Sequence, residues 1–195
     1  MKKDISFGKR AVKYDTGFEG KLSQRFYIDL ISSVSVVDGN HVLDVGCGTG
    51  TILYNLSQTA EIFGYGIDIS DDMLNEARKK CPDMLFQIGD SGSLPFEDNF
   101  MDIVIACMAY HHFSNQDSFR REALRVLKPH GKVYICDPLF PYPIRKTINE
   151  IFKLSNASAR FYNTEEIKID FEHTGFICAE STQDAYVQVL VFEKA

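Results

Sequence analysis

The amino-acid sequence predicts an α/β fold, a three-layer sandwich in which helices cover both faces of a seven-stranded, mostly parallel sheet. Short apolar runs alternate with amphipathic helical stretches, and that order is typical of a parallel sheet. The run that follows Asp102 is continuously apolar, as expected for a strand covered on both faces. The 195 residues contain no internal repeat, and this length favours one domain.

Five strands, with helices between them, are expected in the first part of the chain. The strands cover residues 41–45, 62–67, 84–88, 101–107 and 132–136. The helices cover residues 49–58, 70–80 and 114–128. Ser70 is expected to cap the second helix, where Asp71 and Asp72 suit the positive end of the helix dipole. Pro129 is expected to end the third helix.

The segments at either end complete the predicted architecture. Apolar residues recur every four positions before the first strand, which predicts one or two helices over residues 17–37. Residues 144–154 are also helix-like, and Thr164 is expected to cap a short helix that ends before Gly175. Two β-rich runs, 176–182 and 185–192, are separated by Gln183 and Asp184. Their spacing predicts an antiparallel hairpin at the end of the sheet.

Charge and cysteine content exclude several kinds of partner. The chain has 21 Lys and Arg against 27 Asp and Glu, a net charge of −6, and its basic residues are scattered. A broad nucleic-acid surface needs clustered Lys and Arg, so no such partner is expected. The five cysteines lack Cys-x-x-Cys spacing, which favours free thiols in a reducing cytosol over disulfides or a metal site. Without a long apolar run or a signal-like N-terminus, a cytoplasmic protein without a membrane span is expected.

The strongest local signal is the run VLDVGCGTG at residues 42–50. An apolar strand ends there in a glycine turn that opens a helix, and glycine permits both positive φ and the close approach of a ligand. The dinucleotide fingerprint has its third glycine one residue later, where this chain has Thr51. Asp44 lies two residues before Gly46, and a carboxylate there suits an ammonium or sulfonium ligand better than a pyrophosphate.

Two further acidic residues follow the second and third strands. Asp68 lies 20 residues after Gly48, where an acid can accept both ribose hydroxyls of an adenosine ligand. Asp90 and Ser91 form a polar tip on the third strand. Because ligands of open α/β sheets bind at the carboxyl ends of the strands, Asp44, Asp68 and Asp90 are expected to line one crevice.

Taken together, these stretches resemble the class I S-adenosylmethionine-dependent methyltransferases, in particular the UbiE-like group of small-molecule enzymes. The matching stretches stand in the family's order and are VLDVGCGTG (42–50), GIDIS (66–70), GDSGSLPFEDNFMDIV (89–104), ACMAYHHF (106–113) and VLKPHGKVYI (126–135). The terminal hairpin matches the family's reversed last strand. The resemblance implies a Rossmann-like fold, S-adenosylmethionine as cofactor and S-adenosylhomocysteine as product.

The resemblance also implies a set of cofactor contacts. The residues concerned are Asp44, Gly46, Cys47, Gly48, Thr49, Gly50, Asp68, Ile69, Met73, Asp90, Ser91 and Cys107. Among them, Asp44 would lie near the methionine amino group, Asp68 would bind the ribose hydroxyls and Asp90 would take the adenine amino group. Ile69 and Met73 would pack on the adenine.

The reacting centre of the family lies after the fourth strand, where this chain has Tyr110, His111 and His112. In-line transfer from a sulfonium needs alignment above all, and it needs a general base only when the acceptor must lose a proton. A histidine is the best candidate for that base, and at most one of the two is expected to reach the acceptor. Tyr14, on the N-terminal loop, is expected to cover the cofactor.

Other functions fit the sequence less well. Enzymes that methylate nucleic-acid amino groups usually have an Asp/Asn-Pro-Pro-aromatic loop after the fourth strand, where residues 107–110 read CMAY. An enzyme that methylates RNA or protein stays the first alternative. A cofactor-binding module without catalysis is a second, since the same glycine turn would serve it. The early third glycine and the terminal hairpin disfavour a nicotinamide-dependent oxidoreductase.

The motifs divide the expected single domain, residues 1–195, into four parts. These are an N-terminal helical cap (1–40), a cofactor-binding half (41–136), an insert or lid with a helix (137–175) and a C-terminal β-hairpin (176–195). Too little chain is left for a separate substrate domain. A small-molecule acceptor is therefore expected, with the chain acting as a monomer or homodimer.

Overall fold

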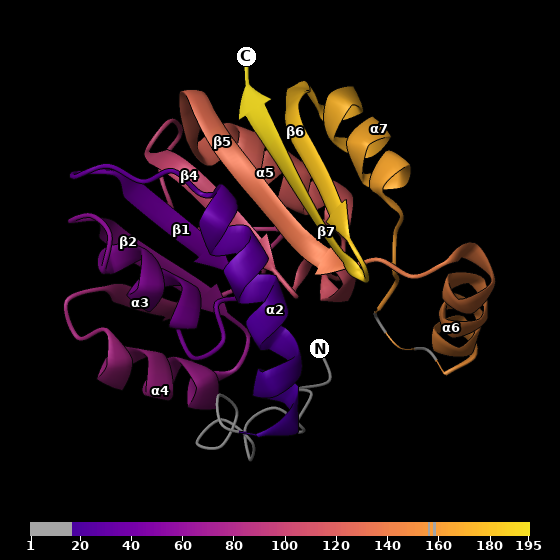
Figure 1. The fold of residues 1–195 in the computed structure, drawn as a ribbon. Coiled ribbons are helices and arrows are strands. Elements are labelled where there is room, and N and C mark those ends of the chain that lie inside the picture. Colours follow the sequence, from indigo (N-terminus) through magenta and orange to yellow (C-terminus); the bar gives the residue numbers. More distant parts are fainter. Residues whose placement is uncertain (1–16, 156, 158) are drawn as a thin grey trace.

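The computed structural model describes residues 17–155, 157 and 159–195. Seven strands in the described chain form one sheet in the order β3-β2-β1-β4-β5-β7-β6 (Figure 1). The strands are β1 (His41–Val45), β2 (Phe63–Asp68), β3 (Leu85–Ile88), β4 (Met101–Cys107), β5 (Leu127–Pro138), β6 (Phe176–Asp184) and β7 (Val187–Lys194). The first five strands pair in parallel, and β7 pairs antiparallel with β5 and β6. The predicted sheet with its reversed hairpin is confirmed.

Helices cover both faces of this sheet. They are α2 (Phe18–Ser33), α3 (Thr51–Ser57), α4 (Asp71–Lys80), the 3₁₀ helix η2 (Tyr110–His112), α5 (Gln116–Val126), α6 (Tyr142–Leu154) and α7 (Thr164–Thr174). One buried cluster joins α2, α3 and α4 to one face, through side chains such as Leu30, Leu53 and Leu74. A second cluster joins α5 and α7 to the other face, through Phe119 and Phe171. The three-layer sandwich is therefore confirmed as well.

Strand alternation puts one acidic residue where apolar residues are expected. Val42 of β1 packs in the first buried cluster, and Leu43 and Val45 pack in the second. Successive strand residues point to opposite faces, so Asp44 shares the face of Val42. Its side chain is 1% exposed. A carboxyl group thus occupies a position that burial ordinarily reserves for an apolar side chain.

The boundary between α5 and β5 differs from the sequence prediction. α5 ends at Val126 and β5 begins at Leu127, several residues before the expected strand start. Leu127 pairs with Met101 of β4, and an irregularity in the β4–β5 register follows. His130 accommodates that irregularity with a φ of 64°. Pro129 is expected from the sequence to end the helix before it, but α5 already ends at Val126 and Pro129 lies within β5.

Two local turns also differ from the prediction. The turn of the β6–β7 hairpin lies at Ala185 and Tyr186, because residues 183 and 184 still pair with β7 and Ala185 has a φ of 52°. The N-cap of α7 is Asn163 and not Thr164. The Asn163 side chain accepts the backbone N–H of Glu166, and the Glu166 carboxylate accepts the backbone N–H of Asn163. This reciprocal pair is a capping box.

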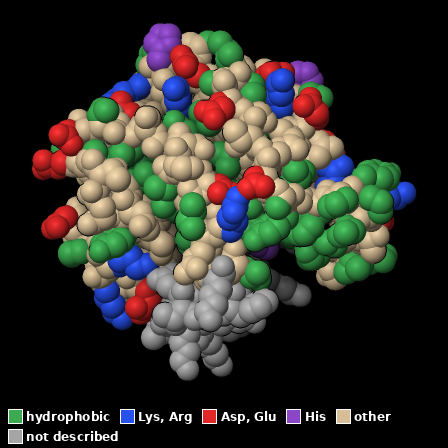
Figure 2. Space-filling view, viewed as in Figure 1, with side chains coloured by type: hydrophobic (Ala, Val, Ile, Leu, Met, Phe, Trp, Pro, Cys, Tyr) green, Lys and Arg blue, Asp and Glu red, His purple; other side chains and the backbone are tan. Residues whose placement is uncertain are grey.

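Helix α6 lies beside the sheet and not on either face of it (Figure 1). Figure 2 shows hydrophobic side chains gathered over it, and Ile151 and Leu154 are 56% and 83% exposed. An ion pair of 2.5 Å between Arg145 and Glu166 ties the helix to the start of α7. Across the described residues, no helix is both long and apolar enough to cross a membrane.

Candidate functional site

The turn after β1 forms one wall of the candidate site. Gly46 has a φ of 79°, and a Cβ atom there would lie 2.5 Å from the Cβ of Ala109, in the turn after β4. Gly48 has a φ of 51°, and apart from the glycine and its two chain neighbours no described atom lies within 4 Å of the place where its Cβ would be. Position 46 therefore requires glycine for packing, whereas Gly48 leaves an open stretch of backbone against which a ligand can lie.

Asp68, the last residue of β2, ties this turn to the neighbouring strand. Its Oδ2 accepts the backbone N–H of Gly48 at 2.9 Å, and its Oδ1 accepts the backbone N–H of Ser70 at 2.8 Å. Burial raises the pKa of the Asp68 carboxyl, although both backbone donors act in the opposite direction. A carboxylate keeps further acceptor capacity after two such bonds, so Asp68 can also receive hydroxyl donors.

The ends of β2 and β3 lie side by side, as the backbone N–H of Gly89 donates to the carbonyl of Asp68 at 3.1 Å. Ile69 is 55% exposed and can meet a flat apolar group, whereas Met73 is only 3% exposed and lies in the core beneath. Asp90 is exposed and its Oδ1 accepts the backbone N–H of Gly92, while Ser91 is buried. The predicted adenine-side residues thus occupy neighbouring strand ends.

Asp44 is the most informative residue of the site. Both of its carboxylate oxygens are buried and lack a hydrogen-bond partner within the described part of the chain. Burial, with a smaller contribution from the charge of Asp68, raises the pKa of Asp44 to about 8. A buried carboxylate without a partner is costly, and a bound cation with several N–H donors would offset that cost. The position therefore fits an ammonium-bearing ligand.

The remaining residues predicted around the turn are largely buried. Cys47 and Cys107 are 7% and 5% exposed, and burial raises the pKa of both thiols, so they are unreactive packing groups at neutral pH. Thr49 is 2% exposed and its hydroxyl lies 3.2 Å from that of Thr51. Gly50, with a φ of 73°, is the N-cap of α3.

A sharp turn after β4 brings His111 to the neighbouring strand. Met108 has a φ of 54°, unusual for a residue other than glycine, and its N–H donates to the carbonyl of Cys136 in β5 at 2.8 Å. The η2 helix follows. His111 Nδ1 lies 2.9 Å from Oδ1 of Asp137, and the backbone N–H of His111 donates to Oδ2 of Asp137 at 3.0 Å. The side chains of the two residues are 4% and 2% exposed.

This His111–Asp137 pair fixes the orientation of the imidazole ring. When Nδ1 carries the proton and donates it to the carboxylate, Nε2 is left as the basic nitrogen of the ring. The ring of His111 stacks on Phe161, with centroids 4.7 Å apart and an interplanar angle of 28°. Phe140 and Phe152 contact Phe161 in turn. The imidazole of His111 thus lies at the edge of a group of three phenylalanine rings, through its contact with Phe161.

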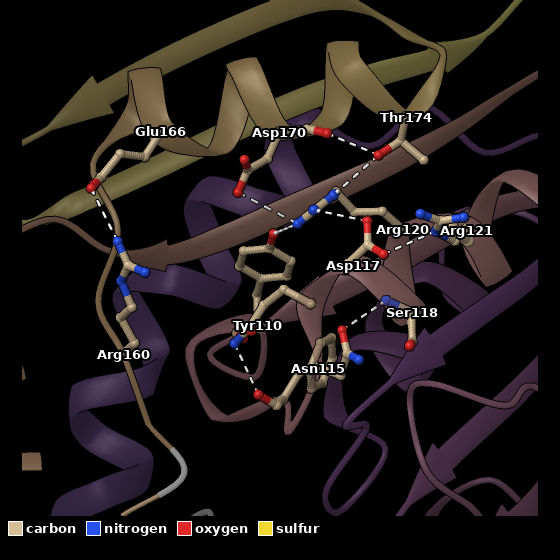
Figure 3. Close-up of polar contacts among 12 residues, drawn as sticks. Tyr110, Asn115, Asp117, Ser118, Arg120, Arg121, Arg160, Glu166, Asp170 and Thr174 are labelled. Atoms are coloured by element: carbon tan, nitrogen blue, oxygen red, sulfur yellow. Dashed lines mark hydrogen bonds and ion pairs between the residues drawn. The ribbon is translucent and has the colours of Figure 1, made fainter. Parts of the chain in front are cut away.

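His112 and Tyr110 lie in different surroundings from His111. His112 is exposed, and its ring centroid lies 4.0 Å from that of His111. Tyr110 is fully buried, and its hydroxyl accepts Nη1 of Arg120 at 3.0 Å between α5 and α7 (Figure 3). Burial raises the pKa of the Tyr110 hydroxyl. This position favours a packing role for Tyr110 over the catalytic one that the sequence suggests.

Sequence reasoning missed Asp137 as a partner of the histidine. The available signal was an acidic residue directly after the apolar run 132–136, the same signal that singled out Asp44 and Asp68. Tyr14 lies outside the described residues. Among the residues that are described, no group of His, Cys, Asp and Glu is arranged to hold a metal ion.

Comparisons with known proteins concern the family and the fold of this chain. Residues 43–135 match the methyltransferase domain family. The demethylmenaquinone methyltransferase of Tropheryma whipplei is 32% identical over 153 residues, 71% of this chain and 63% of the relative. The ubiquinone/menaquinone biosynthesis C-methyltransferase UbiE of Pseudomonas putida is 32% identical over 160 residues, 75% of this chain and 60% of the relative. The chain thus spans about three fifths of the length of these relatives.

Solved structures share the fold at lower identity. The complex of the Haloferax volcanii Trm112 methyltransferase activator with a methyltransferase aligns with a TM-score of 0.84 and 22% identity, over 96% of each chain. Phosphoethanolamine N-methyltransferase 2 of Haemonchus contortus, solved with S-adenosylmethionine, aligns with a TM-score of 0.74 and 16% identity, over 99% of this chain and 61% of that one.

The fold and the family match over residues 43–135 are those of a class I S-adenosylmethionine-dependent methyltransferase domain. S-adenosylmethionine is its cofactor, and the unpartnered carboxylate of Asp44 fits the ammonium group of that molecule. Within this class, the chain is similar in sequence to enzymes of the UbiE type.

Proposed function

We propose that this chain transfers the methyl group of S-adenosylmethionine to a small-molecule acceptor, with His111 as general base. The observation that carries the proposal is the buried His111–Asp137 pair, which lies at the same edge of the sheet as Asp44. A module that only binds the cofactor would have no use for an oriented imidazole there. We therefore favour the catalytic interpretation over the binding module.

The cofactor contacts follow from the placement of the acidic residues. Asp44 would hold the methionine ammonium group, and Asp68 would accept the ribose hydroxyls. Ile69 would pack on the adenine from its exposed position, with Asp90 close to the adenine amino group. When bound, the cofactor supplies an electrophilic methyl group on a sulfonium, so the residues of the chain need chiefly to align the acceptor and exclude water.

His111 would take the proton that the acceptor loses. When the bound cofactor supplies its methyl group to the acceptor and leaves as S-adenosylhomocysteine, Nε2 of His111 would accept the proton that the acceptor loses. Asp137 acts as a positioning residue, because it holds the ring in one tautomer and stabilises the imidazolium that forms. Phe161 limits the ring to one plane by stacking.

The surroundings of His111 indicate a flat acceptor. Phe140, Phe152 and Phe161 form an aromatic group beside the imidazole, and such groups stack on planar rings. The related proteins are named for demethylmenaquinone and for ubiquinone and menaquinone biosynthesis. We therefore propose an acceptor with a hydroxylated or otherwise acidic ring.

All five cysteines are free, which supports the proposed cytoplasmic location.

The proposal is tested in two steps on the full chain. Calorimetry with S-adenosylhomocysteine first measures cofactor binding, and its absence would contradict the assignment of the whole site. Transfer of a labelled methyl group is then measured with demethylmenaquinol and a panel of hydroxylated ring compounds. Label in none of them, and none in a small-molecule extract, would argue against the activity.

The base is tested by substitution. We expect His111→Gln to lower kcat by about 10²- to 10⁴-fold while cofactor binding is retained. Asp137→Asn should lower kcat by about 10- to 100-fold and change the pH profile of kcat/KM, with little change in KM. His130→Gln is the control, since that side chain is 81% exposed near the opposite edge of the sheet. Wild-type turnover of His111→Gln at every pH would exclude it as the base.

A further inference from the structure

A cavity of about 490 Å³ lies between α6 and the segment that leads into α7. Its charged lining consists of Arg145, Lys146, Glu150, Lys153, Arg160 and Glu166. Four cations thus face two carboxylates in a chain whose net charge is −6. We call this space the α6 cavity. It is a local concentration of positive charge in an otherwise acidic protein, and one pocket can differ in sign from the whole surface.

One of the two carboxylates is already engaged by its neighbours. Glu166 accepts a hydrogen bond from Nη1 of Arg145 at 2.5 Å. Its other carboxylate oxygen lies 3.5 Å from Nη2 of Arg160, a contact drawn in Figure 3. It also accepts the backbone N–H of Asn163 in the capping box. Glu166 therefore serves to hold the two guanidinium groups in place. Its charge is balanced within the wall of the cavity.

The two lysines are in a different situation. Neither Lys146 nor Lys153 forms an ion pair with any of the described residues. Both lie on the same side of α6, since residues seven apart are two helical turns apart. Lys146 Nζ lies 6.0 Å from the ring centroid of Tyr142, which also lines the cavity. Two cations and an aromatic ring are thus available to a ligand.

The walls of the α6 cavity are fixed to each other. Asn149 of α6 donates from its side-chain nitrogen to the carbonyl of Phe161 and accepts the N–H of Phe161, both at 2.9 Å. The Arg145–Glu166 ion pair is a second link between α6 and the start of α7. Because the walls are already held in place, binding of a ligand loses less conformational entropy than it would in a pocket whose walls had to be ordered first.

The cavity adjoins the proposed base. The backbone N–H of Arg160 donates to the carbonyl of His111 at 2.8 Å, and the next residue, Phe161, stacks on the imidazole of His111. One molecule can therefore present a reactive atom to His111 and a distant substituent to the α6 cavity.

We propose that the α6 cavity binds the carboxylate or phosphate group of a ring-bearing small molecule. We identify that molecule as the methyl acceptor, and this identification rests on the function proposed above. The acceptor would then differ from a neutral quinol by an acidic substituent, which Lys146 and Lys153 would contact.

The site is tested without knowledge of the acceptor, by fluorescence titration with S-adenosylhomocysteine present. The probes are 1-anilinonaphthalene-8-sulfonate and its uncharged analogue N-phenyl-1-naphthylamine. We expect Lys146→Gln/Lys153→Gln to raise the dissociation constant of the sulfonate by about three- to tenfold and to leave the neutral probe unchanged. Both lysines are exposed, and a melting curve verifies the fold.

The matched control is Lys79→Gln/Arg121→Gln, which lowers the net charge by the same amount on α4 and α5, where these side chains are 70% and 74% exposed. An equal loss of sulfonate affinity in the control, or no loss in the test variant, would overturn the site.

The link to the acceptor is tested separately. A small-molecule extract is divided by anion exchange and each fraction is assayed for labelled methyl transfer. Label in the retained, acidic fraction supports the inference, and the test variant should then raise KM with little change in kcat. Label only in the neutral fraction would refute the acidic acceptor while leaving the methyltransferase activity intact. Label in neither would refute the activity itself, and the probe titration would still decide the cavity.

Discussion

Replacement of Asp44 by Asn should change how the stability of the free protein depends on pH. Burial raises the pKa of Asp44 to about 8, from an ordinary value of 3.8, a difference of about four pKa units. A group whose pKa is higher in the folded state contributes stability at low pH and loses it as the pH rises through the folded-state value. Asp44 should therefore weaken the fold progressively between about pH 4 and pH 8.

The change in the free energy of unfolding follows from the raised pKa of Asp44. Each pH unit within that window removes about 1.4 kcal/mol from the free energy of unfolding, because the unfolded chain releases a proton that the folded chain keeps. Between pH 5 and pH 7 the total is about 3 kcal/mol. Asn is close to Asp in size and does not titrate. The stability advantage of Asp44→Asn over the natural chain should grow by about that amount over the same interval.

The assay is urea unfolding at pH 5, 6 and 7, with and without saturating S-adenosylhomocysteine. The ligand's ammonium group stabilises the ionised carboxylate, so it should flatten the pH dependence of the natural chain and have far less effect on Asp44→Asn. Asp83→Asn, at an exposed position, serves as the control and should follow the natural chain. A stability difference that stays constant from pH 5 to pH 7 would refute the reasoning.

Two further substitutions separate packing from chemistry. Gly46→Ala combines a φ of 79° with a Cβ that would lie 2.5 Å from the Cβ of Ala109, so urea unfolding should show a loss of about 2–4 kcal/mol. A loss below about 0.5 kcal/mol would mean that the turn relaxes freely. Tyr110→Phe removes the acceptor of the Arg120 hydrogen bond and should cost about 1–3 kcal/mol of stability, with kcat for methyl transfer unchanged. A large fall in kcat without a loss of stability would instead indicate a catalytic role for Tyr110.

Much of the site could be predicted because parallel strands end at a common edge. Asp44, Asp68 and Asp90 each follow or end an apolar run, and the connection between strand end and ligand holds for open α/β sheets in general. That relation needs only the order of the elements. It does not need the positions of side chains, which is why the cofactor side of the site was accessible to sequence reasoning.

The partner of His111 could not be predicted in the same way. His111 and Asp137 are 26 residues apart, and they meet because Cys107 of β4 pairs with Cys136 of β5. That register depends on an irregularity near Met101, which leaves no signal in an apolar run. The α6 cavity is a further case, because its walls depend on contacts such as that of Asn149 with Phe161, between a helix and a loop.

The β4–β5 pairing separates the two tasks of the protein along the chain. Asp137 directly follows the paired Cys136 of β5, and His111 lies one short turn beyond the paired Cys107 of β4, so the buried centre of the sheet sets the geometry of the proposed base. The aromatic group and the α6 cavity come from residues 139–166, which return to the sheet only afterwards. Exchange of residues 139–166 would therefore change the acceptor that is bound while the geometry of the His111–Asp137 pair stays the same. This segment is a natural unit for both evolutionary divergence and engineering.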